Sequence, residues 1–600
     1  MKADKLTLER VFDRTERLET PLFQRPYVWK EEENWVPLWE AIETIAQRKL
    51  EDKATRPHFL GTIVLDQLKT QTGNIHARQI IDGQQRLTTL QILLAAMRDL
   101  SAQHNQPKYA DTFRKLTDNH FPLSSDPDIV FKVWPTNADR EDFRDVMKAG
   151  SIQAVANLPH ADPEDEYLLP NAYLWFSEKI NSWLLVDGPE KLPLRMEVLY
   201  TTLREELLLV VIDLEEADDA QEIFETLNAL GTPLLPADLI KNYLFHIAEG
   251  QNLEMAGLYE KYWKGFDQDK SYWRKDTRQG RLKRPRLDHY LGHYLVLKTG
   301  ADVIFTQLFS SFKDYVRSSD HVLASTHMED FKSYADVYRS FDDFPEDTRE
   351  GTFFWRLDQL DTTTVYPLLL EIFKNRGASR DKSDILEIMT DIESFLVRRS
   401  VCELTPKNYN QVFTSLIRSL REGGGFTAQA IRQWLLEQTA ETSIWPSDKQ
   451  FRDAWMTLKF YKRLKKTKCN MILEAIEDAM RTGKTEKVIL EHNLTLEHLL
   501  PREWEKHWPL VPDGKATIDE LRQRRQETIH RIGNLTLLTK ALNPSVSNGP
   551  WIKKREQILK HSALNLNRIF QEQEEWNEAA IGKRSQTLFD YAVKVWPHPV

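Results

Sequence analysis

Cysteine is almost missing from this sequence. Only two, Cys402 and Cys469, occur among 600 residues. Two cysteines so far apart in the sequence cannot build a disulfide framework or a cysteine-ligated zinc site within one chain. Such sparing use of cysteine fits a reducing cytosol.

Long apolar runs are missing as well. The longest ones, such as Leu207–Ile212, are too short to span a bilayer. The N-terminal residues Met1–Lys5 lack the apolar core of a signal peptide. We therefore expect a soluble, cytoplasmic protein with no membrane partner.

Glycine is scarce, and the chain is long. With 22 glycines and long amphipathic stretches, the sequence favours helix over strand. A length of 600 residues is too great for one core and predicts about two to four domains. The formal net charge of −10 argues against a protein that coats DNA indiscriminately, although local basic patches can still bind it.

The N-terminal part contains the clearest strand signals. His58–Leu65 is short, apolar and partly β-branched, and a second such run ends at Ile81. Another buried strand is predicted over Leu207–Asp213. Apolar residues at steps of three and four, from Leu87 to Met97, predict a helix directly after the second strand.

Asp82–Arg86 closes that strand and opens that helix. A turn containing glycine leaves free backbone N–H groups at a helix N-terminus, where anions are favoured. Arg86 adds a forked donor suited to phosphate, Gln84 and Gln85 can hydrogen-bond a sugar or phosphate, and Asp82 could bind a metal or ribose hydroxyl. On physical grounds alone, Asp82-Gly83 is more often a plain turn than part of a nucleotide site.

The C-terminal part contains the residues that most resemble a catalytic site. Glu497-His498 is followed by Asn534 and Asn543. A neutral His can take a proton from an attacking water, since its ordinary pKa lies close to working pH. A carboxylate and an amide oxygen are ligands that suit Mg²⁺. The alternative is structural, because His498-x-x-Pro501 and Gly533-Asn534 are each typical of turns.

The segment from about 490 to 600 resembles the HNH, or His-Me finger, nucleases, specifically the C-terminal domain of GmrSD-type (BrxU-like) type IV modification-dependent restriction enzymes. The resemblance rests on the residues above together with Asn548 and the pair Lys553-Lys554. It implies a ββα-metal fold, His498 as general base, Glu497 and Asn543 as ligands of Mg²⁺ or Mn²⁺, and Asn534 as the residue that fixes the loop and orients the His. Many relatives have Asp where this chain has Glu497.

The N-terminal region resembles the N-terminal domain of the same family, which is related to the ParB/sulfiredoxin fold. The matching segments are Gln24–Trp29, Phe59–Gly61 and Asp82–Arg86. The resemblance implies binding and hydrolysis of a nucleoside triphosphate, ATP or GTP. The residues expected at the nucleotide are Gln24, Arg25, Asp82, Gly83, Gln84, Gln85 and Arg86.

A further block, Asp218–Asn242, resembles two other signatures of that domain, but Leu230 stands where the family usually has Arg. Two interpretations remain open for it. It is either a capped helix pair that closes the first domain or a ligand site using Asn228, Asp238 and Lys241.

Two basic stretches are candidates for DNA contact. Arg274–Arg286 is rich in cations and follows Tyr272 and Trp273, so it could track a phosphate backbone or be a solvated loop. Lys459–Lys468 precedes the nuclease-like segment. The residues predicted to bind DNA are Lys459, Lys462, Arg463, Lys553 and Lys554.

Together these features predict a predominantly helical α+β chain with three parts: a nucleotide-binding domain over 1–245, a helical region over 246–445 and a nuclease domain over 446–600. The expected function is nucleotide-regulated, metal-dependent cleavage of modified double-stranded phage DNA, such as DNA with glucosylated hydroxymethylcytosine or methylcytosine. A homodimer is compatible with two cuts per duplex. The alternatives are a nucleotide-switched sensor or scaffold without nuclease activity, and a toxin-like nuclease acting on RNA or unmodified DNA.

Overall fold

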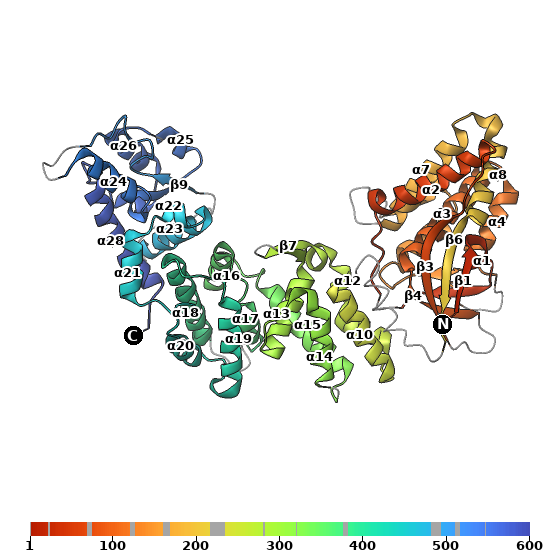
Figure 1. Ribbon diagram of the computed structural model, residues 1–600, viewed down its shortest axis with the longest axis horizontal. Coiled ribbons are helices and arrows are strands. Elements are labelled where there is room, and N and C mark those ends of the chain that lie inside the picture. The colour runs from red at the N-terminus through yellow and green to blue at the C-terminus, as the bar shows by residue number, and fades with distance from the viewer. Residues whose placement is uncertain are drawn as a thin grey trace. The chain divides into compact units, whose positions relative to one another are not determined.

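The computed structural model describes most of the chain. The described residues are 2–21, 24–68, 75–120, 126–159, 168–215, 235–279, 282–319, 321–375, 382–481, 494–510, 516–546 and 548–599. They form two compact units (Figure 1). The first consists of Met1–Lys275, Arg286–Asp288 and Phe312–Glu329, and the second of Asp276–Pro285, His289–Ser311 and Asp330–Val600. Both contain helices and small sheets with helix predominating, which confirms the predicted fold class.

The first unit contains a six-stranded mixed sheet with the strand order β1-β6-β3-β4-β2-β5. Strands β3 and β6 pair in parallel, while β3 and β4 are antiparallel, and Asp82 lies opposite Val64. The three strands expected from the sequence are therefore present. The strand bounds are β1 Lys2–Thr7, β2 Glu16–Glu19, β3 His58–Gln67, β4 His76–Asp82, β5 Val133–Trp134 and β6 Leu207–Asp213.

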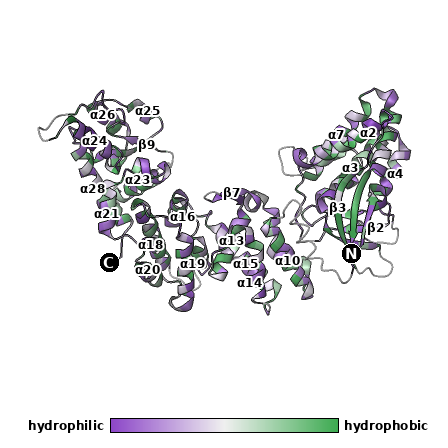
Figure 2. Cartoon of the chain, in the orientation of Figure 1, coloured by the Kyte–Doolittle hydropathy of each residue, from purple (hydrophilic) through white to green (hydrophobic). Residues whose placement is uncertain are grey.

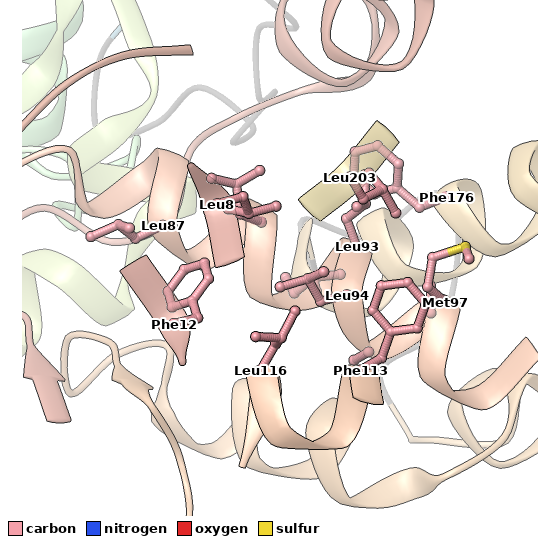
Figure 3. Packing of buried hydrophobic residues seen from close by; sticks show 14 of the residues in the cluster. Leu8, Phe12, Leu87, Leu93, Leu94, Met97, Phe113, Leu116, Phe176 and Leu203 are labelled. Carbon is pink, nitrogen blue, oxygen red and sulfur yellow. The ribbon is translucent and has the colours of Figure 1, made fainter. Parts of the chain in front are cut away.

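Helix α3, Gln84–Gln103, is the centre of this unit's core. It is buried on almost every side, because other helices surround it as well as the sheet. Figure 3 shows Leu93, Leu94 and Met97 of α3 packed among Phe113 of α4 and Phe176 of α7. The surrounding helices are α1 Leu8–Phe12, α2 Val36–Leu50, α4 Pro107–Thr117, α5 Arg140–Ala149, α6 Ile152–Ala156, α7 Leu168–Leu185 and α8 Leu192–Thr201.

The first unit continues after residue 235 with further helices. Leu239 of α10 packs against Val64, Ile81 and Leu214, so α10 is joined to the sheet by apolar contacts. The bounds are α10 Pro236–Gly250, α11 Met255–Leu258 and α12 Lys264–Gln268, with short π-helical turns at η4 Tyr259–Trp263 and η5 Lys270–Arg274. The predicted helix over 218–231, with Asn228 and Leu230, lies outside the described residues.

The second unit begins with an antiparallel pair of strands, β7 Asp276–Gln279 and β8 Leu282–Pro285, and both strands lie within the basic run 274–286. The helices that follow have hydrophobic and hydrophilic faces (Figure 2). Their bounds are α13 Arg286–Thr299, α14 Leu308–Arg317, α15 Ala324–Ser340, α16 Arg349–Leu360, α17 Tyr366–Lys374, α18 Lys382–Val401, α19 Tyr409–Ser419, α20 Ala428–Leu436, α21 Asp448–Thr457, α22 Phe460–Arg463 and α23 Lys466–Met480.

The second unit ends in a two-stranded antiparallel sheet, β9 Thr495–His498 and β10 Leu535–Leu538, enclosed by helices. The remaining bounds are α24 Ile518–Thr528, η8 Ile532–Asn534, α25 Leu542–Val546, α26 Trp551–His561, α27 Asn565–Arg568 and α28 Glu578–Val595.

The residues after α28 connect this region to α18. The Trp596 indole donates to Glu393 Oε1 at 2.8 Å, and the Arg398 guanidinium donates to the Trp596 carbonyl. The Ser394 hydroxyl donates to the carbonyl of Pro597 at 2.6 Å. Among the helices of the described ranges, none has the length and apolarity needed to cross a bilayer.

Candidate active site

The predicted catalytic residues meet across the small sheet of the second unit. His498 lies opposite Leu535, and Glu497 lies opposite Thr536. The short helix η8 delivers Asn534 just before β10, so its side chain reaches the loop that follows His498. The two sequence motifs, which are more than thirty residues apart, are therefore neighbours in space.

Asn534 fixes the loop after His498. It is fully buried, and its Oδ1 accepts hydrogen bonds from the Leu500 N–H at 2.8 Å and the Trp576 indole at 3.0 Å. Its Nδ2 donates to the carbonyls of Leu500 and Ile529 at 2.9 and 2.8 Å. Every polar atom of the side chain is thus used internally, which supports a positioning role for Asn534 rather than contact with a substrate.

Gly533 is needed because another helix comes close to it. A Cβ atom at this position would lie 2.1 Å from the Ile581 carbonyl oxygen and 2.3 Å from Ser585 Oγ, both on α28. Arg584 of the same helix donates to the carbonyls of Gly533 and Leu535 at 2.8 and 2.7 Å. The glycine therefore permits close packing of α28 on the turn that carries Asn534.

His498 lies in a nearly closed, aromatic environment. Only 5% of it is exposed, and its ring lies 4.4 Å from that of Tyr461, between centroids. Its Nε2 is 3.2 Å from Nδ1 of His530, so one of the two rings donates this hydrogen bond. Burial lowers the pKa of His498 to about 3, helped by His530 and by the charges of Arg502 and Lys554. His498 is therefore neutral at ordinary pH and can accept a proton.

A group of cations surrounds His530. Burial lowers the pKa of His530 to about 4, and the charges of Lys462, Arg502 and Lys459 lower it further. Lys462 is exposed and Lys459 is half-buried. Two of the predicted DNA-binding residues thus lie beside the histidine pair. Arg463, a third, is exposed and forms an ion pair with Glu403.

Glu497 faces a different set of partners from His498, because neighbouring side chains leave a strand on opposite faces. Its Oε1 accepts a hydrogen bond from Lys554 Nζ at 2.5 Å, and the same ammonium donates to the His498 carbonyl at 2.7 Å. Lys554 is 1% exposed. This burial does not fit the DNA-contacting role expected for Lys554, whereas Lys553 is exposed.

Asn543 is attached to the same strand. Its Nδ2 donates to the Thr495 hydroxyl at 2.9 Å, and Thr495 shares a strand face with Glu497. Within the described part of the chain, Oδ1 of Asn543 has no hydrogen-bond partner and remains available as a ligand. Asn548, which also belongs to the motif, is exposed and donates to Glu503 at 2.9 Å.

The oxygens of Glu497 and Asn543 fit a hard divalent cation by their chemistry. No cluster of three or more His, Cys, Asp or Glu side chains among the described residues could hold a metal. A cation bound here would therefore have few protein ligands and would complete its shell with water and phosphate, as Mg²⁺ commonly does.

In the first unit, the motif glutamines hold Gln24–Val28 against the sheet and α3. Gln24 Nε2 donates to the carbonyls of Ile80 and Ile81 at 2.8 and 3.0 Å. Gln85 accepts from the Val28 N–H at 2.8 Å and donates to the Pro26 carbonyl at 3.0 Å. Gln84 donates to the Arg25 carbonyl at 3.3 Å, and its buried Oε1 has no partner within the described ranges. These three side chains therefore position the neighbouring charged residues.

The turn at Gly83 is made possible by its positive φ of 95°. A Cβ atom there would also lie 2.5 Å from the Ile63 side chain. Arg86, just beyond the turn, donates to the Thr62 carbonyl at 2.7 Å. Burial raises the pKa of the preceding Asp82, opposed by the charges of Arg86 and Arg25.

Asp238 and Lys241 lie in a buried ionic network close to Arg25. Arg274 donates to Asp238 at 2.7 Å and to Asp267 at 2.9 Å, and Lys241 forms an ion pair with Asp267. Lys241 also donates to the Gln24 carbonyl at 3.4 Å. The segment Gln24–Trp29 and the described part of Asp218–Asn242 therefore meet at this network. Burial lowers the pKa of Arg25, the charge of Asp238 raises it, and the charge of Arg274 lowers it.

Two models of known protein families match the chain. Residues 8–245 match the family described as GmrSD restriction endonuclease, N-terminal domain. Residues 445–591 match GmrSD restriction endonucleases, C-terminal domain. The chain belongs to the GmrSD restriction endonuclease family. No curated protein matches the sequence.

Membership of the GmrSD family makes the chain a restriction endonuclease with DNA as its substrate. Sequence reasoning had located Glu497, His498, Asn534 and Asn543, but it assigned no catalytic part to Tyr461, His530 or Arg502. Tyr461 lies within the basic run Lys459–Lys468, where the sequence predicts contact with DNA. His530 is three residues before Gly533, and nothing in that spacing shows that its ring would pair with His498.

Proposed function

We propose that this GmrSD-family chain is a nucleotide-regulated, metal-dependent endonuclease that cleaves modified phage DNA, with His498 as the general base. The observation that carries the proposal is the environment of His498. Its neutral ring is buried beside Tyr461 and His530, a group of cations lies next to it, and Glu497 precedes it in the same strand. A site of this kind offers a proton acceptor, an attraction for phosphate and a carboxylate ligand within one short strand and its surroundings.

The cations bring the phosphate to the histidine. Lys459, Lys462 and Arg502 surround His530, and a phosphodiester attracted to them would approach His498 as well. A base with a pKa near 3 has little driving force to take a proton at neutral pH. Burial is the main cause of this low pKa, and the charges of Arg502 and Lys554 add to it; a negative phosphate offsets those charges, so DNA binding raises the pKa of His498.

The proton transfer uses both ring nitrogens of His498. With Nε2–H donated to Nδ1 of His530, Nδ1 of His498 keeps its lone pair and takes the proton from water. Asn534 keeps the following loop, and therefore the ring, in place. Glu497 and Asn543 Oδ1 would hold Mg²⁺ or Mn²⁺, which when bound neutralises charge that develops on the scissile phosphate.

Nucleotide control is assigned to Arg25, Asp82 and Arg86. Gln84 holds the Arg25 carbonyl, and two guanidinium groups beside the free N–H groups of α3 suit the phosphates of ATP or GTP. Asp82 is available to a cation or a ribose hydroxyl.

The proposal is tested by cleavage of three DNAs: unmodified plasmid, cytosine-methylated plasmid and phage DNA with glucosylated hydroxymethylcytosine. Each is incubated with Mg²⁺ or Mn²⁺, with and without ATP or GTP. Cutting is expected only of a modified DNA, and His498→Ala should remove it. The matched control is His561→Ala, which changes an exposed His of the same unit.

Nucleotide dependence is tested separately. Arg86→Ala should lose the response to nucleotide, whereas Arg114→Ala, at a side chain that is 58% exposed in the same unit, should keep it. Equal cutting of all three DNAs would refute modification dependence. Full activity of His498→Ala would refute the assignment of the base.

A further inference from the structure

We infer that the helical part of the second unit contains a second nucleotide site, at the N-terminus of α23. The site consists of two adjoining cavities with volumes of about 570 and 180 Å³. They share Gln279, Thr363 and Thr364 in their walls. The larger volume lies within the range of small-molecule sites, roughly 300–1,000 Å³. None of these residues belongs to the Asp82–Arg86 motif, so the inference stands apart from the proposed function.

The larger cavity is suited to phosphates. Lys468 lines it, and burial lowers the pKa of this lysine, as does the charge of Lys465. Lys465 forms an ion pair with Asp361 at 2.9 Å, and Arg463 pairs with Glu403. Within the described ranges, Lys468 has no carboxylate at ion-pair distance. The charge of Asp361 acts on Lys468 from beyond ion-pair distance and opposes the lowering of its pKa, so this partly desolvated ammonium still favours an anion from outside.

The backbone adds to this preference. Helix α23 begins next to the cavity, with Lys465 as its N-cap and no side chain capping its first N–H groups. The helix runs from Lys466 to Met480, and its aligned peptide dipoles place positive potential at this end. Free N–H groups, the helix dipole and Lys468 therefore act on the same space.

The smaller cavity is suited to a heterocyclic base. Its walls include the apolar side chains of Val296, Phe305 and Pro367. Two polar atoms in its walls, Nε2 of His293 and the hydroxyl oxygen of Thr364, are shielded from solvent and have no partner within the described chain. Buried polar groups are normally hydrogen-bonded, so an unused donor or acceptor beside an empty volume indicates a missing ligand. A base edge supplies both kinds of partner.

A ligand at this place would be linked to the candidate active site through α23. The helix contacts both β9 and β10, and it directly follows α22, which carries Tyr461 and Lys462. The chemistry therefore points to a nucleotide that acts as an effector of the nuclease, with phosphates at Lys468 and the base beside His293.

The experiment measures how many molecules of a non-hydrolysable ATP analogue bind to each full-length chain at equilibrium. Lys468→Met should weaken one class of sites by at least about tenfold, the loss of one charge-assisted hydrogen bond. Lys449→Met, which changes an exposed lysine of α21, should bind as wild type does. Thr364→Phe, which fills the passage between the cavities, should remove the same class of sites.

A second measurement needs no variant. An azido-ATP analogue photolysed on the wild-type chain should label residues 289–305 or 360–367. Labelling only elsewhere, or unchanged binding by both Lys468→Met and Thr364→Phe, would overturn the inference. Failure of the nucleotide-control proposal would give a different result. Arg86→Ala would then bind as many analogue molecules per chain as wild type, while Lys468→Met would still lose one class of binding sites.

Discussion

Lys554 offers the sharpest test of the candidate active site. Its ammonium is 1% exposed and holds both the Glu497 carboxylate and the His498 carbonyl. Lys554→Met keeps the length of the side chain and leaves a carboxylate without its counter-charge. Removing one partner of a buried pair costs about 3–5 kcal/mol. Since 15% of the Glu497 side chain is exposed and can be hydrated, we expect the lower end, about 3 kcal/mol.

The assay is thermal unfolding followed by calorimetry. At about 2.1 cal/mol/K of unfolding entropy per residue, a unit of about 300 residues shifts by roughly 1.5 °C per kcal/mol, so the transition of the second unit should fall by about 5 °C. Lys553→Met, at the exposed neighbouring lysine, should change stability by less than about 0.5 kcal/mol. Adding Glu497→Gln to Lys554→Met removes the unpaired charge and should recover part of the loss.

Mg²⁺ extends the test to the metal. A cation bound at Glu497 replaces the missing charge, so Mg²⁺ should raise the unfolding temperature of Lys554→Met more than that of wild type. Identical unfolding of Lys554→Met and Lys553→Met would refute the buried pair, and no response of either chain to Mg²⁺ would argue against Glu497 as a ligand.

Three more predictions concern the same region. Gly533→Ala should destabilise the unit by about 1–3 kcal/mol or more in urea melts, because its Cβ would meet the Ile581 carbonyl at 2.1 Å, whereas Gly549→Ala has only a 3.6 Å contact and should be tolerated. Asn534→Asp should lower the melting temperature and the yield of soluble protein, since it sets a carboxylate oxygen against two carbonyls that now receive Nδ2–H bonds. The pKa values of His498 and His530, about 3 and about 4, lie below the ordinary 6.5, so the unfolded chain binds the protons and stability falls as pH drops below about 6.5, by at most about 1.4 kcal/mol per pH unit for each His. Urea melts at several pH values should show that the unfolding free energy of His530→Asn changes less with pH than that of wild type. An unchanged pH dependence would contradict this account.

Local patterns in the sequence were enough to predict several elements of the first unit. The strand expected over Leu207–Asp213 has those bounds, because a short apolar run that contains Val210, Val211 and Ile212 favours a buried strand. The turn at Asp82-Gly83 was predicted from strand, glycine and helix signals that all agree. What the sequence could not reveal is that Gln24 and Gln85 use their amides internally, since this depends on how a distant segment docks.

Lys554 shows a signal that could have been used. Trp551, Lys554 and Ile558 recur at helical spacing and form the buried face of α26. Two adjacent lysines are typical of an exposed basic pair, but this periodicity predicts that only Lys553 is exposed and that Lys554 lies on the buried face. The pairing of His498 with His530, and the enclosure of both by Tyr461, had no such signal because three separate elements create it.

The contacts made by Trp596 and Pro597 also bear on the order in which parts of the second unit can pack during synthesis. Arg398 and Glu393 of α18 also pair with Asp448 and Arg356, but they gain their contacts with Trp596 only once residue 596 has been synthesised, roughly 30–120 s after residue 1 at usual rates. Helix α28, whose packing requires Gly533, emerges just as late. A chain that stops before α28 therefore lacks the helix that packs on the turn carrying Asn534.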